Sequence, residues 1–176
     1  MSLIRRMLGS WWPLWAAIAA AAMLAIAHAF ETFGHLPPCE LCLRQRDVYW
    51  AALAVGVLGW RLELALPGRR FAAVFAGVLA LVFLFQTGLA GYHAGVEWKW
   101  WPGPQSCSGQ GRADAQAITA LLNGARIQGP SCDVARWRWL GLSMAGWNAL
   151  VALGLAALSL AACAIGLRRP TTRFGA

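Results

Sequence analysis

Residues 71–91 read FAAVFAGVLALVFLFQTGLAG, a stretch without a single charged side chain. A helix needs about 20 such residues to cross the roughly 30 Å hydrocarbon core of a bilayer. Three further apolar stretches of comparable length lie at 12–30, 48–66 and 139–167. The sequence therefore predicts an all-α membrane protein, a single domain over 1–176, in which four transmembrane helices form an antiparallel bundle.

The overall composition agrees with a membrane protein. Hydrophobic residues make up 59% of the chain and charged residues only 12%, whereas roughly a quarter of the residues of a soluble domain are charged. The formal net charge of +8 is compatible with nucleic-acid binding. However, the basic residues lie mainly at the ends of the apolar stretches, where they anchor helices and set their orientation. We therefore expect no nucleic-acid partner.

The hydrophilic segments differ in charge on the two sides of the predicted membrane. The N-terminus, the segment 61–70 and the C-terminal tail share one side, and they carry Arg5, Arg6, Arg61, Arg69, Arg70, Arg168, Arg169 and Arg173 against the single acid Glu63. By the positive-inside rule this side is cytoplasmic. We therefore expect both termini in the cytoplasm of a bacterial-type cell, and the loops at 31–47 and 92–138 on the periplasmic face of its inner membrane.

Four of the five cysteines fall in the two outward loops. These are Cys39, Cys42, Cys107 and Cys132. The periplasm is oxidising, so thiols that meet there are expected to form disulfides. Cys163 instead lies inside the last apolar stretch, and we expect it to be a small apolar core residue.

The first pair is a Cys-x-x-Cys motif, Cys39 and Cys42, preceded by Pro37-Pro38. Proline is tolerated where a helix begins, so the motif is expected at the start of the second helix, with both thiols on one face. Free N–H groups and the helix dipole at that position are expected to lower a cysteine pKa. Half of a zinc site is the alternative, but the other cysteines show no ligand spacing that would complete it.

Two arginines follow the motif. Arg46 lies four residues after Cys42 and seven after Cys39, so it shares their helical face, whereas Arg44 points elsewhere. A guanidinium beside two thiols can stabilise a sulfur anion or donate to a carbonyl oxygen. We expect this role for Arg46 and a lipid-headgroup contact for Arg44. Tyr49 is within reach of a bound ring, but an aromatic residue at the membrane interface is the commoner interpretation.

The second pair, Cys107 and Cys132, lies far apart in a Gly- and Pro-rich loop. A disulfide in such a loop is accessible to attack by the thiolate of another protein. A purely structural disulfide is the alternative. Between the two cysteines, apolar residues recur at helical spacing over 117–122, which predicts a short amphipathic helix lying on the membrane surface.

Two outward cysteine pairs next to a membrane helix suggest a thiol–disulfide relay. In each exchange a thiolate attacks a disulfide, so electrons pass from one pair to the other. The electrons must then leave the inner pair. The sequence holds no haem, flavin or nucleotide motif, and a lipid-soluble acceptor needs none. A quinone is therefore the expected acceptor.

At these residues the chain resembles the disulfide bond formation protein B (DsbB) family. The resemblance covers almost the whole chain and rests on the four apolar stretches and three motifs. The motifs are Pro38-Cys39-Glu40-Leu41-Cys42 with Arg46, the approach from Tyr92-His93 through Trp101-Pro102-Gly103-Pro104 to Cys107, and Cys132 ahead of Trp137 to Asn148. In bacteria this family works with DsbA and quinone to keep the periplasm oxidising.

The resemblance implies roles and a direction of electron flow. Reduced DsbA, a thioredoxin-like oxidase, would attack a Cys107–Cys132 disulfide and form a mixed disulfide at Cys107. The freed Cys132 would then attack Cys39, and the released Cys42 would pass electrons to ubiquinone, or to menaquinone without oxygen. Arg46 would hold the quinone. His93 is a further candidate to lie near it, although an interface histidine without a chemical role is equally compatible.

Two other functions fit the same residues. A membrane reductase of the vitamin K epoxide reductase type also uses a Cys-x-x-Cys in a helix bundle, but in that family the active motif lies nearer the end of the chain. A membrane scaffold with two structural disulfides would not be an enzyme at all. The residues by themselves leave the direction of electron flow open.

Overall fold

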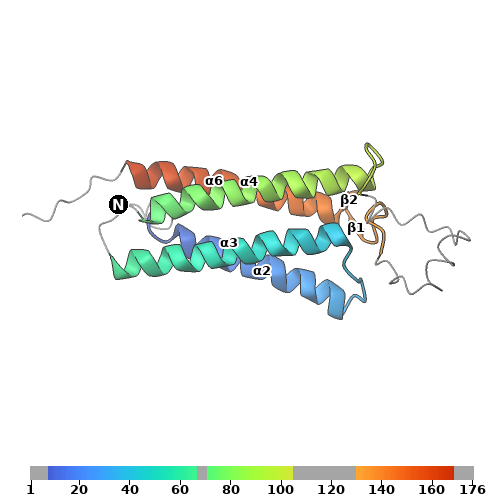
Figure 1. Ribbon diagram of the computed structural model, residues 1–176, viewed down its shortest axis with the longest axis horizontal. Coiled ribbons are helices and arrows are strands. Elements are labelled where there is room, and N and C mark those ends of the chain that lie inside the picture. Colours follow the sequence, from blue (N-terminus) through green and yellow to red (C-terminus); the bar gives the residue numbers. More distant parts are fainter. Residues whose placement is uncertain (1–7, 67–70, 105–129, 169–176) are drawn as a thin grey trace, which may run out of the picture.

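The computed structural model describes residues 8–66, 71–104 and 130–168. Within these ranges four helices are long and apolar enough to cross a membrane: α2 (Trp12–Thr32), α3 (Glu40–Ala65), α4 (Phe71–Glu97) and α6 (Met144–Leu167). They run in alternating directions in one elongated bundle (Figure 1). The predicted four-helix membrane bundle is therefore confirmed.

The helices do not coincide with the apolar stretches at the end of the bundle that carries the cysteines. α3 begins at Glu40, well before the apolar stretch, and α4 continues beyond its own stretch to Glu97. Polar residues can extend a helix past the bilayer because the helix satisfies its own backbone hydrogen bonds. These extensions place the side chains of His93 and Glu97 on a helix rather than in a loop.

A small hairpin delays the start of α6. Its strands β1 (Arg138–Trp139) and β2 (Leu142–Ser143) pair antiparallel. The two residues between them, Leu140 and Gly141, have φ of 49° and 81°, as expected for the tight turns that match the twist of paired strands. The Oγ of Ser143 then caps α6 by accepting a hydrogen bond from the backbone N–H of Gly146 at 3.1 Å. α6 therefore begins after the apolar stretch does.

Small residues let the helices approach closely. A Cβ atom at Gly56 of α3 would lie 2.7 Å from the carbonyl oxygen of Pro13 in α2, and one at Gly166 of α6 would lie 2.7 Å from the Cβ of Ala73 in α4. Membrane helices associate through such contacts because lipid provides no hydrophobic drive between them. α4 contacts α6 and α2 contacts α3 extensively, whereas α2 and α6 contact each other little.

The middle of the bundle is filled by an apolar cluster. Its buried members include Ala16, Leu79 and Phe83, and Cys163 packs against it. The expectation of a small apolar role for Cys163 is therefore confirmed. Trp12 also belongs to the cluster and donates a hydrogen bond to the Oγ of Ser159 at 3.0 Å. Trp12 is therefore part of the interior of the bundle, where its indole N–H has a partner.

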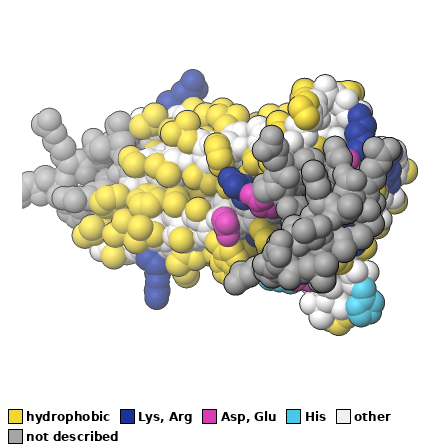
Figure 2. Space-filling model, turned by 45° about the vertical axis from the view of Figure 1, so that its right-hand side comes forward, with side chains coloured by type: hydrophobic (Ala, Val, Ile, Leu, Met, Phe, Trp, Pro, Cys, Tyr) yellow, Lys and Arg dark blue, Asp and Glu magenta, His cyan; other side chains and the backbone are white. Residues whose placement is uncertain are grey.

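The outside of the bundle is apolar. Hydrophobic side chains dominate the sides of the helices in the view of Figure 2. On α4, Leu81 and Phe85 are 67% and 64% exposed although they lie in the uncharged stretch 71–91. Such an apolar surface requires lipid as its solvent. The chain is an integral membrane protein.

An ion pair joins the chain just after α4 to the residue that follows Cys132. The Nζ of Lys99, just after α4, donates to the side chain of Asp133 at 2.6 Å and to its backbone carbonyl at 2.7 Å. The Lys99 ammonium holds the pKa of the Asp133 carboxyl below its ordinary value. Cys107 and the amphipathic helix predicted at 117–122 lie outside the described residues.

Candidate redox site at one end of the bundle

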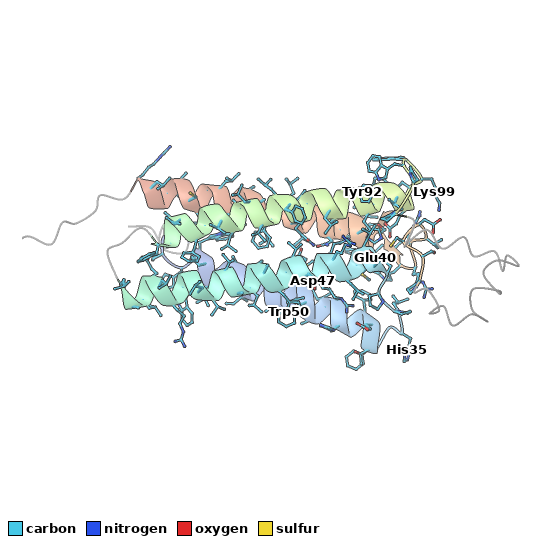
Figure 3. All side chains as sticks on the ribbon, in the orientation of Figure 1. His35, Glu40, Asp47, Trp50, Tyr92 and Lys99 are labelled. Carbon is cyan, nitrogen blue, oxygen red and sulfur yellow. The ribbon has the colours of Figure 1, made fainter. Side chains whose placement is uncertain are left out.

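The Cys-x-x-Cys motif forms the start of α3. Cys39 is the N-cap, and its Sγ accepts a hydrogen bond from the backbone N–H of Cys42 at 3.3 Å. The two sulfur atoms are 2.8 Å apart, and both residues are free thiols. Figure 3 shows this end of the bundle, where Glu40 marks the beginning of α3 and Tyr92 and Lys99 lie nearby. The motif therefore lies at the start of the second membrane helix, as the prolines before it predicted.

The two cysteines of the motif differ in their electrostatic environment. The two thiols share a hydrogen bond in which either sulfur can be the donor, and Cys39 is buried. The contact with Cys42 and the burial both raise the pKa of Cys39 well above its ordinary value. The expectation that the helix start lowers the pKa was therefore wrong for Cys39. The hydrogen bond between the thiols outweighs the dipole, and it stabilises negative charge on Cys42 instead.

Cys132 lies beside this motif. It is disulfide-bonded, it is 1% exposed, and it forms a small buried cluster with Cys39 and Leu41. Cys42 also packs against this cluster. The structure thus brings together three of the four predicted redox cysteines. The fourth, Cys107, lies outside the described residues.

The two arginines after the motif have separate positions. Arg46 is largely buried and bonds the carboxylate of Glu31 at 2.5 Å and the carbonyl of Ala27 at 3.1 Å, both on α2. It lines the same cavity as Cys39 and Cys42. Arg44 is exposed and pairs with Glu40 at 2.7 Å. The helical spacing therefore separated the two arginines correctly.

His93 of α4 lies inside the site, with 4% of its surface exposed. Its Nε2 is 3.7 Å from the Sγ of Cys39 and 3.9 Å from the carboxylate of Glu97, and its Nδ1 is 2.9 Å from the amide nitrogen of Gln45. The structure therefore places His93 beside Cys39, and a chemical role for this histidine stays a prediction. The spacing of His93 and Glu97 by one helical turn was the available sequence signal for this site.

His93 lies close enough to the two thiols to form a candidate metal site with them. Cys39, Cys42 and His93 each offer one ligand atom, and these atoms all lie within 4.8 Å of one another. Cysteine and histidine are the ligands that zinc prefers. Sequence spacing missed this group because the histidine comes from a different helix.

A cavity of about 370 Å³ opens beside the two thiols. Its wall is mostly apolar and includes four aromatic rings, paired as Phe30 with Trp137 and Trp139 with Trp147, at 5.3 Å between ring centroids in both pairs. α2 and α6, the helices that contact each other little, both line it. A mostly apolar cavity with a few polar groups is suited to an organic ring molecule.

Tyr49 is one of the polar groups on this wall. It is 4% exposed, and its hydroxyl donates to Asn148 at 2.5 Å. The interpretation of Tyr49 as an aromatic residue at the membrane interface was wrong. Its neighbour Trp50, at 53% exposed, does lie on the outside of the bundle (Figure 3).

The sequence model of Disulfide bond formation protein DsbB matches residues 9–162. The chain belongs to the DsbB family. Three similar proteins, each called Disulfide bond formation protein B, come from Dechloromonas aromatica (strain RCB), Nitrosococcus oceani and Xanthomonas axonopodis pv. citri. Each is 31% identical, over 78%, 80% and 81% of this chain and 82%, 82% and 83% of the relative.

Membership of the DsbB family confirms the main functional prediction. The chain is a membrane oxidoreductase that generates disulfides, and reoxidation of DsbA with transfer of electrons to quinone is the activity of the family. Neither the vitamin K epoxide reductase type nor a scaffold without activity is supported. Cys39, Cys42 and Cys132 lie close together, and Cys39 and Cys42 line the apolar cavity.

Proposed function

We propose that this chain reoxidises a periplasmic DsbA-type dithiol through Cys107 and Cys132, and that Cys39 and Cys42 pass the electrons to ubiquinone, with menaquinone as the alternative. The observation that carries the proposal is the position of Cys132. It is buried beside Cys39, and Cys39 itself lines an apolar cavity. The proposal places the site at the periplasmic face of a bacterial inner membrane, with both termini in the cytoplasm.

Each exchange moves one electron pair. A thiolate of the partner attacks Cys107, a sulfur–sulfur bond forms, and the Cys107–Cys132 bond breaks. The Cys132 thiolate then attacks Cys39 and breaks the Cys39–Cys42 bond, which leaves Cys42 as a thiolate. Once the second thiol of the partner has released Cys107, the Cys107 thiolate attacks Cys132, the Cys107–Cys132 bond re-forms, and Cys39 leaves as the second thiolate of the reduced inner pair. The Cys39 thiol and the helix start stabilise negative charge at this sulfur once the inner pair is reduced.

The cavity fits a quinone. A quinone has a flat ring with two carbonyl oxygens and, when bound, supplies a two-electron acceptor. The aromatic wall suits the ring, and Arg46 suits a carbonyl oxygen. The guanidinium has five N–H donors, of which the bonds to Glu31 and Ala27 use two. Arg46 is therefore proposed to hold the quinone, with His93 as a further contact of the ring.

Turnover in lipid vesicles tests the function. The purified protein is mixed with a reduced DsbA-type protein, with and without ubiquinone, and loss of partner thiols is followed. We expect oxidation only with quinone, loss of that activity in Cys39→Ser, and full activity in the matched control Cys163→Ser. Undiminished turnover by Cys39→Ser would contradict the proposal. Replacing ubiquinone by menaquinone in the absence of oxygen compares the two acceptors.

The partner is tested by trapping. In Cys132→Ser, Cys107 is left as a thiol, and its thiolate can attack the disulfide of an oxidised DsbA-type protein. One sulfur–sulfur bond of that protein breaks as the mixed disulfide to Cys107 forms, and Cys132 is not there to resolve it. We expect a DsbA-type protein to be captured from periplasmic extract by Cys132→Ser and not by a variant that also carries Cys107→Ser. Capture that does not depend on Cys107 would contradict the proposal that the mixed disulfide forms at this residue.

A further inference from the structure

A chain of hydrogen bonds leads from the interior of the bundle to the Cys39 sulfur. The Tyr49 hydroxyl donates to the Oδ1 of Asn148 at 2.5 Å, and the Nδ2 of Asn148 donates to the Oε1 of Gln45 at 2.5 Å. The Nε2 of Gln45 is 2.9 Å from the Nδ1 of His93, whose Nε2 is 3.7 Å from the sulfur of Cys39. Residues of α3, α4 and α6 thus form one connected path.

This path has a direction. A side-chain amide donates only through its nitrogen and accepts only through its oxygen. The amide of Gln45 accepts from Asn148, so it turns its NH₂ group toward His93. The Nδ1 of His93 must then be the acceptor, and the proton of the neutral ring lies on Nε2. Turning Gln45 alone would set two N–H donors against each other, and turning Asn148 alone would set two oxygen acceptors against each other. Only both amides together can therefore reverse the path.

The surroundings of Nε2 agree with a proton at that atom. The Cys39 sulfur is 3.7 Å away and the nearest Glu97 carboxylate oxygen 3.9 Å away, and the backbone carbonyl of Cys132 lies within hydrogen-bonding reach of the ring. All three groups can accept. A bare nitrogen lone pair at this position would face acceptors, which is unfavourable in a buried site.

We propose that Tyr49, Asn148 and Gln45 are positioning residues that hold His93 in its Nε2–H tautomer. The ring then presents a hydrogen-bond donor to the Cys39 sulfur. This donor stabilises Cys39 when it carries negative charge during exchange, a step that rests on the proposed function. The role of Gln45 and Asn148 is to fix which nitrogen of His93 carries the proton. These two residues do not take part in thiol exchange themselves.

The same tautomer keeps a metal out of the site. Cys39, Cys42 and His93 have the donor atoms for a soft divalent cation. A metal binds the lone pair of an imidazole nitrogen, and metal-bound histidines usually donate their other N–H to an acceptor. Here Gln45 donates to Nδ1 instead, so the Nε2 lone pair is occupied by a proton. The polar path thus selects thiol exchange over metal binding.

Nitrogen NMR reads the tautomer without any turnover. The chain has 3 histidines, so protein labelled with ¹⁵N-histidine and reconstituted in lipid with the inner pair reduced gives few signals. The His93→Gln spectrum assigns the signal. We expect His93 to be protonated at Nε2 and bare at Nδ1 in the unmodified protein. A proton at Nδ1 would overturn the proposal, whatever the quinone assay shows.

Asn148→Asp tests the direction of the path without touching His93. A carboxylate cannot donate, so Gln45 is expected to turn its NH₂ group toward position 148 and its oxygen toward His93. The proton then moves to Nδ1, and the reactivity of Cys39 toward an alkylating reagent falls on the order of 10-fold as the donor is lost. Tyr49→Phe removes only the first donor, and we expect a mixture of both tautomers. An unchanged Nε2–H signal in Asn148→Asp would contradict the proposal.

Gln45→Glu supplies a gain-of-function test. A carboxylate accepts from Nδ1–H and so supports a metal at Nε2. We expect the reduced variant to bind Cd²⁺ about 10- to 100-fold more tightly than the unmodified protein, followed by the sulfur-to-metal absorption band. The Gln45→Glu/His93→Gln double variant is the control and should lose this gain. Equal Cd²⁺ affinity with and without Gln45→Glu would overturn the metal-excluding role.

Discussion

The middle of the bundle and its polar end are built from different kinds of residue. In the middle, Gly56 lets backbones touch, and Ala16, Leu79 and Phe83 fill the interior. At the polar end, amide, imidazole, carboxylate and thiol groups from three helices meet around a cavity. The difference separates two tasks. The middle sets how closely the helices pack, and the end sets the reactivity of the sulfurs.

Cys42→Ala should give the largest effect of any single change. It removes one of the two thiols that line the cavity, the one proposed to pass electrons to the quinone. Quinone-dependent oxidation should therefore fall to background, a loss on the order of 1,000-fold or more by analogy with removal of an enzyme nucleophile. Turnover and thermal unfolding are measured on the same sample. We expect unchanged unfolding, and activity above background would show that electrons can leave the site without this thiol.

Arg46→Ala should weaken the quinone site without abolishing the reaction. A hydrogen bond from a charged group contributes about 1.5–3 kcal/mol, so the quinone KM should rise about 10- to 100-fold. Arg44→Ala is the matched control, because Arg44 is exposed and bonds only Glu40 among the described residues. Equal effects of the two substitutions would show that charge at the membrane surface matters and the position on the cavity does not.

Gly56→Ala tests the middle of the bundle. The new Cβ would lie 2.7 Å from the carbonyl oxygen of Pro13, and forcing α2 and α3 apart should lower the free energy of unfolding by about 1–3 kcal/mol. Gly154→Ala is the control, since a Cβ there meets nothing within 4 Å. Thermal unfolding in detergent distinguishes them. Equal stability of both variants would mean that α2 and α3 can adjust.

Trp12→Phe should have a smaller effect in the same region. The change removes the indole N–H that donates to Ser159 across the bundle, and an ordinary hydrogen bond contributes about 1 kcal/mol. Unfolding should shift by that amount while the quinone KM stays constant. A changed KM would show that the middle and the polar end are coupled after all.

Asp133→Asn should have the smallest effect, and it should depend on pH. The pKa of Asp133 is lowered by Lys99, so the pair stabilises the fold above the ordinary aspartate pKa of about 3.9. That contribution is lost as the pH falls below this value through the lowered pKa. For a partly exposed pair we expect about 0.2–1 kcal/mol at neutral pH. Unfolding followed at several pH values checks this, and a difference that persists at pH 2 would exclude the ion pair as its cause.

The four membrane helices and the position of the cysteine motif at a helix start could be predicted from the sequence, because both depend on local patterns. The apolar stretches gave the four spans, and helical spacing placed Arg46 but not Arg44 with the thiols. The raised pKa of Cys39 could not be predicted, because it depends on a hydrogen bond to Cys42 that competes with the helix dipole.

The polar path was beyond sequence reasoning for a related reason. Gln45 and Asn148 are 103 residues apart in the chain, and Gln45 and His93 are 48 apart. Each of these residues looks ordinary within its own helix, and only the contacts among α3, α4 and α6 join them. The late start of α6 was missed because the turn at Leu140 and Gly141 uses a leucine where glycine or asparagine is usual.

The bond between Lys99 and Asp133 has a consequence for exchanging parts of this molecule. It fastens the chain just after α4 to the residue next to Cys132, so the fixed base of the loop is set independently of the sequence inserted between them. We therefore expect residues 105–129 to be exchangeable for the matching segment of a relative, with Cys132 kept in place beside Cys39. Because Cys107 belongs to this segment, the proposed function predicts that such an exchange alters partner choice.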